Sequence, residues 1–173
     1  MIKYFPSVCD GPFEVAKVLL RPEEHNKSMY PDIVATADTI DVEANAKAAC
    51  QRHIFDNKRD KNGHLIYNEE EVRALYDMVE ICRKHGATPI FVTVPYMSEY
   101  TNAIMQSDSD FFPTFYDWIE SVSSDLQVNY YDYSMDKRFI NDYSLFYNAD
   151  HMNTKGAKKF TSILYDEVIK QLI

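Results

Sequence analysis

The spacing of apolar residues becomes regular only in the later part of the chain. Residues 1–65 contain long polar stretches that favour exposed loops, and two short helices are predicted among them, over 13–20 and 41–55. The second helix is expected to place three small or apolar side chains on one face: Ala44, Ala48 and Cys50. The pattern therefore predicts an irregular, partly helical N-terminal segment, 1–65, followed by a regular part, 66–173.

A long amphipathic helix is predicted over residues 68–86. Acidic residues fill its first turn and basic residues its last turn, which matches the helix dipole. Asn68 is placed to cap the first turn, and Gly86 is placed to end the helix in the left-handed conformation. The side chains expected to face the core are Val72, Leu75, Tyr76, Val79 and Cys82.

The β-branched run TPIFVTVP, residues 88–95, predicts a strand that is buried on both faces. A second amphipathic helix is predicted over 107–127, a short strand over 128–134, and a last helix from about Thr154 to the end. Helix, strand, helix, strand, loop and helix is the order of an α/β fold with a parallel sheet and flanking helices. In such sheets functional groups lie on loops beyond the carboxyl ends of the strands.

Composition and charge narrow the range of partners. The chain has 173 residues, enough for a single domain with its own core, and a formal net charge of −9. Because acidic surfaces repel phosphate backbones, no nucleic-acid partner is expected. No segment has the roughly 20 apolar residues that span a bilayer, and the N-terminus lacks a signal-peptide core. As written, the chain is expected in the cytoplasm; as part of a longer protein, it would be exported or membrane-anchored.

The residue spacing predicts neither a metal nor a cofactor. The three cysteines are widely separated, which favours reduced thiols over a disulfide framework or a zinc site. The aspartates within 132–153 lack the spacing of a calcium loop, and no histidine pair has metal-ligand spacing. The tyrosines of the second strand, Tyr130, Tyr131 and Tyr133, suit a half-buried strand, with stacking on a carbohydrate as the alternative.

The loop FYNADHMN, residues 146–153, contains the main candidate for chemistry, His151. This residue lies within a turn of the predicted C-terminal helix, whose positive dipole end favours a neutral imidazole, and a neutral imidazole can act as a general base. The alternative is that His151 and Asn153 only satisfy free amides at the start of the helix. The local sequence alone favours the second interpretation.

The wider stretch FYNADHMNTKGAKKFTSIL resembles the C-terminal block of SGNH/GDSL-type hydrolases and acyltransferases, including relatives of the D-alanyl transfer proteins of cell-wall teichoic acid. HMN, KGAKKF and the following helix match that block, and the preceding helix ending in CRKHGA and the strand PIFVTVP are also similar. The resemblance covers about residues 65–173. Each motif is weak alone, and the resemblance depends on their occurring together in this order. It implies a flavodoxin-like fold and a Ser-His-Asp triad that performs acyl transfer.

On this resemblance His151 matches the base of the family, and Asn148 stands where the family has its acid. An asparagine carbonyl can hold the imidazole tautomer but cannot stabilise the imidazolium by charge. Asp150 could replace the acid only through an unusual turn, because adjacent side chains on a turn seldom face each other; otherwise it would interact with the helix dipole. The Gly-Asp-Ser turn of the family does not occur in the sequence, and Ser7 and Cys9 are weak candidates for the nucleophile.

Two functions are predicted from these features. In the first, the chain is the C-terminal portion of an SGNH-like esterase or acyltransferase that acts on small-molecule or carbohydrate O-acyl esters, and it is inactive alone because it lacks the nucleophile. In the second, the chain is a non-catalytic α/β binding or assembly module. Either way the sheet is incomplete, so a partner chain or a missing N-terminal half is expected to cover its edge.

Overall fold

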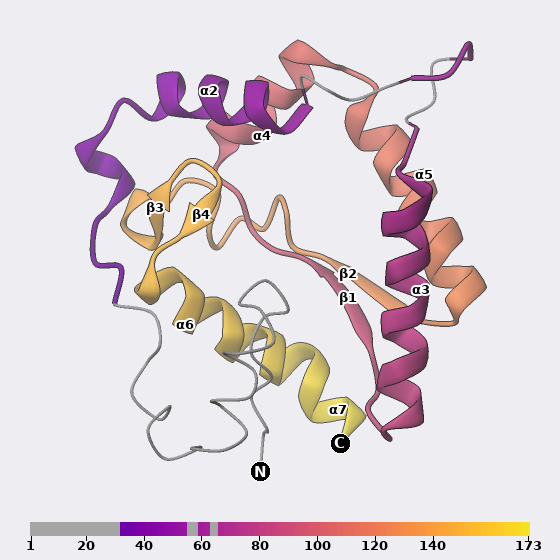
Figure 1. The fold of residues 1–173 in the computed structure, drawn as a ribbon. Helices are drawn as coiled ribbons and strands as arrows, with labels where there is room; N and C mark the ends of the chain where they lie inside the picture. The colour runs from indigo at the N-terminus through magenta and orange to yellow at the C-terminus, as the bar shows by residue number, and fades with distance from the viewer. Residues whose placement is uncertain (1–31, 55–58, 63–65) are drawn as a thin grey trace, which may run out of the picture. The chain divides into compact units, whose positions relative to one another are not determined.

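The computed structural model describes residues 32–54, 59–62 and 66–173 (Figure 1). The helix expected over 13–20 lies outside these ranges. All elements named below belong to one compact unit, Val34–Ile173. This unit combines helices with short strands, so the expected α/β class is confirmed at that level.

Two of the predicted strands form a parallel pair, β1 (Ile90–Thr93) and β2 (Asn129–Asp132), with Ile90 opposite Asn129. Figure 1 shows them side by side. The expectation that β1 is buried on both faces is wrong, because all of its residues are half-buried. Two short strands offer helices too little area to cover both faces of a sheet completely.

The helix α3 (Glu69–Lys84) precedes β1, and both of its predicted ends are confirmed. Asn68 Oδ1 accepts a hydrogen bond from the backbone N–H of Glu70 at 2.9 Å. Gly86 has a φ of +73°, a left-handed conformation that favours glycine. Of the predicted inner stripe, Val79 is buried and the other four residues are half-buried: Val72, Leu75, Tyr76 and Cys82.

Two helices connect β1 to β2, although only the second was expected. α5 (Phe111–Leu126) buries Ile119 and Val122, as its apolar spacing predicts. α4 (Ser98–Ser107) was missed because its N-cap residue, Met97, makes no capping hydrogen bond from its side chain. Tertiary packing stabilises α4 through four buried residues: Tyr100, Thr101, Ala103 and Ile104.

α2 (Val42–Ile54) packs against α4 within the same compact unit, so a boundary after residue 65 does not divide this unit. The helix was expected, but the face assigned to it is wrong in part. Ala44 and Ala48 are exposed, whereas Cys50 is buried. The buried face consists of Val42, Ala46, Ala49 and Cys50. A helix rich in alanine shows little contrast between its faces, so the sequence pattern did not identify the inner one.

The C-terminal part forms a hairpin and a nearly continuous helix. β3 (Phe146–Asn148) and β4 (His151–Met152) are antiparallel. The helix begins where the sequence predicts and runs through α6 (Thr154–Leu164), the π-helical turn η5 (Tyr165–Ile169) and α7 (Lys170–Leu172). Large buried side chains fill the core in this region: Phe139, Leu145, Phe146 and Phe160. Two short 3-10 helices are also present in the described ranges: η3 (Ala37–Thr39) and η4 (Tyr143–Leu145).

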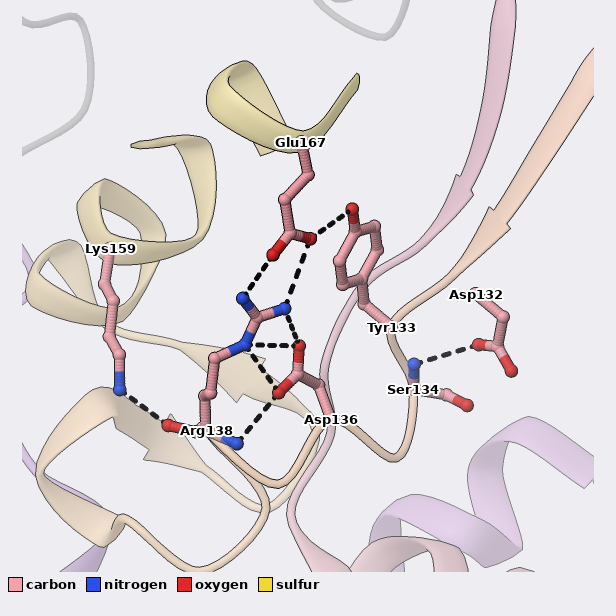
Figure 2. A network of polar contacts seen from close by, with 7 residues as sticks. All are labelled: Asp132, Tyr133, Ser134, Asp136, Arg138, Lys159 and Glu167. Carbon is pink, nitrogen blue, oxygen red and sulfur yellow. Dashed lines mark hydrogen bonds and ion pairs between the residues drawn. The ribbon is translucent and has the colours of Figure 1, made fainter. Parts of the chain in front are cut away.

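A polar network, called the Arg138 network below, fixes the segment after β2 to the C-terminal helix (Figure 2). Arg138 Nε donates to both oxygens of Asp136 at 2.9 Å, and its Nη1 lies 2.5 Å from Glu167 Oε1. The Tyr133 hydroxyl donates to Glu167 at 3.0 Å, and Lys159 Nζ donates to the carbonyl oxygen of Arg138 at 2.6 Å. Hydrogen bonds from Arg138 are the main reason why the pKa values of Asp136 and Glu167 lie below their ordinary values.

Candidate functional site around the β3–β4 hairpin

His151 lies in β4, shortly before the C-terminal helix, and 65% of its side chain is exposed. The helix cap is Asn153, whose Oδ1 accepts from the backbone N–H of Gly156 at 3.0 Å. Asn153 Nδ2 also donates to the carbonyl oxygens of Ser144 and Ala35. Among the described residues, no hydrogen bond joins His151 to the helix amides. The capping role therefore belongs to Asn153, and His151 makes different contacts.

The imidazole of His151 is held by Asn148, since its Nδ1 lies 3.1 Å from Asn148 Oδ1. The same amide oxygen accepts from the backbone N–H of Asp150 at 3.3 Å, which only an oxygen can do. Because this oxygen is an acceptor, the neutral ring has its hydrogen on Nδ1 and its lone pair on Nε2. A general base requires a lone pair of this kind on a nitrogen that solvent or substrate can reach.

The hairpin register explains how Asp150 and His151, although adjacent, face each other. β3 and β4 are joined by residues 149–150, and their register places Asn148 opposite His151. In this tight turn Asp150 Oδ1 lies 3.2 Å from His151 Nδ1, and only 3% of the Asp150 side chain is exposed. The sequence admitted such a contact only for an unusual turn, and the hairpin is that turn. The structure thus brings together the three predicted site residues: Asn148, Asp150 and His151.

A second histidine, His53 of α2, reaches Asp150, and no motif in the sequence pointed to it. Its Nε2 lies 3.8 Å from Asp150 Oδ2, and its Nδ1 lies 2.7 Å from the hydroxyl oxygen of Tyr100 on α4. Burial is the largest of the causes that raise the pKa of Tyr100 far above its ordinary value, and the neighbouring Tyr96 and Asp150 add to the rise. Tyr100 therefore stays protonated and can donate its hydroxyl hydrogen to His53.

A pocket of about 230 Å³ opens beside His53 at the carboxyl end of β1. Val92 and Val94 line one side, and α5 supplies four aromatic side chains: Phe111, Phe112, Phe115 and Tyr116. Burial raises the pKa of Tyr116 to about 12, so this part of the lining is uncharged at neutral pH. Parallel sheets bind ligands beyond the carboxyl ends of their strands, and an aromatic lining suits an apolar group.

Among the described residues, no nucleophilic side chain makes a hydrogen bond with Nε2 of His151. Cys50 is buried in α2, where its Sγ lies 3.5 Å from the carbonyl oxygen of Ala103, and burial raises the pKa of its thiol. Ser7 and Cys9 lie outside the described ranges. Within those ranges, no group of three His, Cys, Asp or Glu side chains is arranged to hold a metal ion. What the described site offers is a base with its orienting groups.

Comparisons of the chain with protein-family models, with curated proteins and with solved structures found no match. In the part of the chain that the structure describes, no helix is long and apolar enough to cross a membrane.

Proposed function

We propose that this chain carries the base of an SGNH-like esterase or acyltransferase, and that His151 is this base. The observation that carries the proposal is the hydrogen bond of 3.1 Å between His151 Nδ1 and Asn148 Oδ1. Residue 148 is the position that the resemblance gives to the orienting group, and the bond leaves Nε2 free to accept a proton. In this proposal β1 and β2 belong to a flavodoxin-like sheet, and the substrate is an O-acyl ester, with polysaccharide esters as the class suggested by the resemblance.

Asn148 and Asp150 together replace the acid of the triad in this proposal. Asn148 fixes the tautomer of His151 but has no charge to stabilise an imidazolium. Asp150 supplies that charge, because one of its oxygens lies 3.2 Å from His151 Nδ1. The carboxylate is buried but 65% of the His151 side chain is exposed, so water screens part of this interaction.

In the proposed reaction, a serine hydroxyl gives its proton to His151 Nε2 while its oxygen attacks the ester carbonyl carbon. The imidazolium returns this proton to the leaving alcohol, which produces an acyl-serine. Water or an acceptor alcohol then releases the acyl group by the same proton transfers. We assign the serine and the oxyanion donors to residues outside the described ranges or to another chain, because the described neighbours of His151 include neither.

A non-catalytic binding or assembly module is the second candidate function. It is favoured by the absence, among the described residues, of a nucleophile on His151 Nε2. It is also favoured by the sheet, because in the described part of the chain β1 and β2 pair only with each other. Strand edges without a neighbour tend to pair with strands of other chains. In this function the sheet edge would bind the partner, and the tautomer of His151 would have no role.

The tautomer of the neutral His151 ring distinguishes the two candidates. For a general base we expect the nitrogen chemical shifts of the ring at pH 8 to show hydrogen on Nδ1 and a lone pair on Nε2. Asn148→Ala should remove this preference, whereas Asn148→Asp should preserve it. His85, which is exposed at the end of α3, provides the reference ring. A His151 ring that carries its hydrogen on Nε2 would contradict the proposal.

Ester hydrolysis tests whether the nucleophile lies within this chain. We expect p-nitrophenyl acetate to be hydrolysed near the background rate by the chain and by His151→Ala, because a base without a nucleophile does not form an acyl-enzyme. A rate that disappears in His151→Ala would place the nucleophile within the chain. The variants Ser7→Ala and Cys9→Ala would then identify it.

A further inference from the structure

Within the part of the chain that the structure describes, Asp150 is a buried carboxylate without a hydrogen bond. The residue is 7% exposed, and neither carboxylate oxygen has a hydrogen-bond partner among the described residues. Such a group is unfavourable unless a positive charge or a polarised N–H lies close to it. Two imidazole nitrogens do: His151 Nδ1 at 3.2 Å from Oδ1, and His53 Nε2 at 3.8 Å from Oδ2.

We propose that His53 is a positioning residue that acts on His151 through Asp150. In this proposal the two imidazoles together bind one extra proton, whose charge is paired with the Asp150 carboxylate. The inference rests on the proposed function, because it describes how the proposed base is regulated. His53 is far from the hairpin in the sequence. It reaches Asp150 because α2, which carries it, packs against α4, and Tyr100 of α4 holds its ring.

Tyr100 determines which nitrogen of His53 presents a hydrogen to Asp150. The hydroxyl oxygen of Tyr100 lies 2.7 Å from His53 Nδ1, and in the proposed arrangement the hydroxyl donates to this nitrogen. A neutral imidazole that accepts on Nδ1 carries its hydrogen on Nε2, which is the nitrogen that faces Asp150. His53 is therefore held between a donor and a carboxylate. At 3.8 Å from Oδ2, His53 Nε2 is too far for a hydrogen bond and acts on the carboxylate electrostatically, while the other oxygen of Asp150 faces His151.

A single carboxylate cannot neutralise two imidazolium ions. When His151 binds a proton, its charge is paired with Asp150 across 3.2 Å. A second proton on His53 would meet a carboxylate that is already paired, so it binds less readily. Groups coupled in this way titrate as a pair, in two steps. In this proposal a proton on His53 disfavours a second proton on His151, which helps to keep the proposed base unprotonated.

The other ionisable groups around the pair do not change charge near neutral pH. Burial raises the pKa values of Tyr96 and Tyr100 and that of the Cys50 thiol, so all three remain uncharged. Arg52 of α2, which acts on Tyr100, has a permanent positive charge. Asp132, which acts on Tyr96, is a carboxylate at the end of β2. The coupling that we infer is thus one between the two imidazoles and Asp150.

The inference is tested by following the ring Cε1–H signals of His53 and His151 by NMR as the pH is lowered from 9 to 4. In the unmodified chain we expect both titration curves to show two steps, because each ring senses the protonation of the other. In His53→Gln the curve of His151 should become a single step, because the second imidazole that couples to it is absent. In Asp150→Asn both curves should become single steps. The curve of His85 should stay the same throughout.

A His151 curve that is a single step in the unmodified chain, or that is the same in His53→Gln, would overturn the inference. The first of these results needs no variant, so a His53→Gln chain that fails to fold does not prevent the test. The readout also needs no enzymatic activity. If the curves are coupled but the His151 ring carries its hydrogen on Nε2, the coupling of the two imidazoles is supported and the proposed function is contradicted. If the tautomer is as proposed but the curves are independent, only the role of His53 falls.

Discussion

The carboxylates of the Arg138 network and of the hairpin site differ in their hydrogen bonds and in the charge of their partners. Asp136 accepts from the guanidinium of Arg138 and also from its backbone N–H at 2.8 Å. Asp150 is more deeply buried, yet it has two imidazoles nearby and no hydrogen bond among the described residues. The first carboxylate has a partner with a permanent charge, whereas the partners of the second have a charge that depends on pH.

The difference separates a structural network from a candidate functional site. A carboxylate with several hydrogen bonds to arginine stabilises one arrangement of the chain at neutral pH. A buried carboxylate without such bonds contributes little to stability, and its effect is to hold and polarise neighbouring groups. Departures from full hydrogen bonding are expected at functional sites, where the rest of the fold compensates for them. The hairpin site fits that description, and the Arg138 network does not.

The largest expected effect comes from Gly156→Ala, which tests how rigidly the hairpin is held on α6. A Cβ at this position would lie 2.0 Å from the carbonyl oxygen of Leu145 and 3.2 Å from Cβ of Met152. Backbone atoms cannot move aside as the end of a side chain can. We therefore expect the free energy of unfolding, measured with urea, to fall by about 3 kcal/mol. The Nδ1–H tautomer of His151 should be lost as the hairpin shifts.

Gly86→Ala is the matched control for this substitution. Gly86 also has a special role, but a Cβ there would meet no atom within 4 Å, so only the positive φ of +73° opposes it. That conformation costs about 1 kcal/mol for an alanine. Equal losses in the two variants would show that the hairpin adapts to the extra methyl group. The tight contact between α6 and Leu145 would then not be what positions the site.

Exchanging each carboxylate for an amide compares the two regions directly. Asp136→Asn keeps an acceptor for the backbone of Arg138 but removes the charge that pairs with its guanidinium. We expect a loss of about 1 kcal/mol at pH 8. Asp150→Asn removes a buried charge that accepts no hydrogen bond from the described residues, so the free energy of unfolding at pH 8 should stay the same or rise.

Urea unfolding of both variants at pH 8 provides the measurement. A loss in Asp150→Asn that exceeds the loss in Asp136→Asn would contradict the comparison, because it would show that Asp150 is well satisfied in the folded chain. Asp117→Asn, on the exposed side of α5, measures the effect of removing a negative charge from this acidic chain. Its own change is subtracted from the other two.

Much of the fold could be predicted where the local sequence decides the structure. The ends of α3 depend on Asn68 and Gly86, whose side chain and backbone act within one turn of the chain. The strands and the last helix also follow from short patterns. α4 could not be predicted in this way, because it has no capping side chain and is stabilised by packing against α2. Contacts between distant segments leave no signal in one sequence.

In the candidate site, too, contacts between residues close in the sequence could be predicted and contacts between distant segments could not. The contact between Asn148 and His151 spans only three positions, so the motif that contains both residues was enough to predict it. The contact between Asp150 and His151 requires the register of β3 and β4, which the motif does not specify. His53 comes from a segment far earlier in the chain, and only the packing of α2 brings it to Asp150. It was therefore beyond prediction from the sequence.

The smallest expected effect is a change in the acid sensitivity of folding in Arg138→Gln. Hydrogen bonds from Arg138 lower the pKa values of Asp136 and Glu167 in the folded chain. A lowered folded-state pKa stabilises the protein above the unfolded-state value of about 4, and this stabilisation is lost as the pH falls through the folded-state pKa. The unmodified chain should thus exceed Arg138→Gln in stability most at neutral pH. The difference should disappear at about pH 2.

Thermal unfolding at several pH values provides the measurement. Arg138 is partly exposed, so solvent weakens its ion pairs, and we expect a difference in Tm of about 1–3 °C at pH 7. The difference should become smaller in 1 M salt, where the Debye length is about 3 Å, than in 0.1 M salt, where it is about 10 Å. Arg73→Gln, an exposed arginine on α3, controls for the lost positive charge. A Tm difference that persists at pH 2 would show that Arg138 acts by packing its stem. Charge pairing would then not be what distinguishes the Arg138 network from the hairpin site.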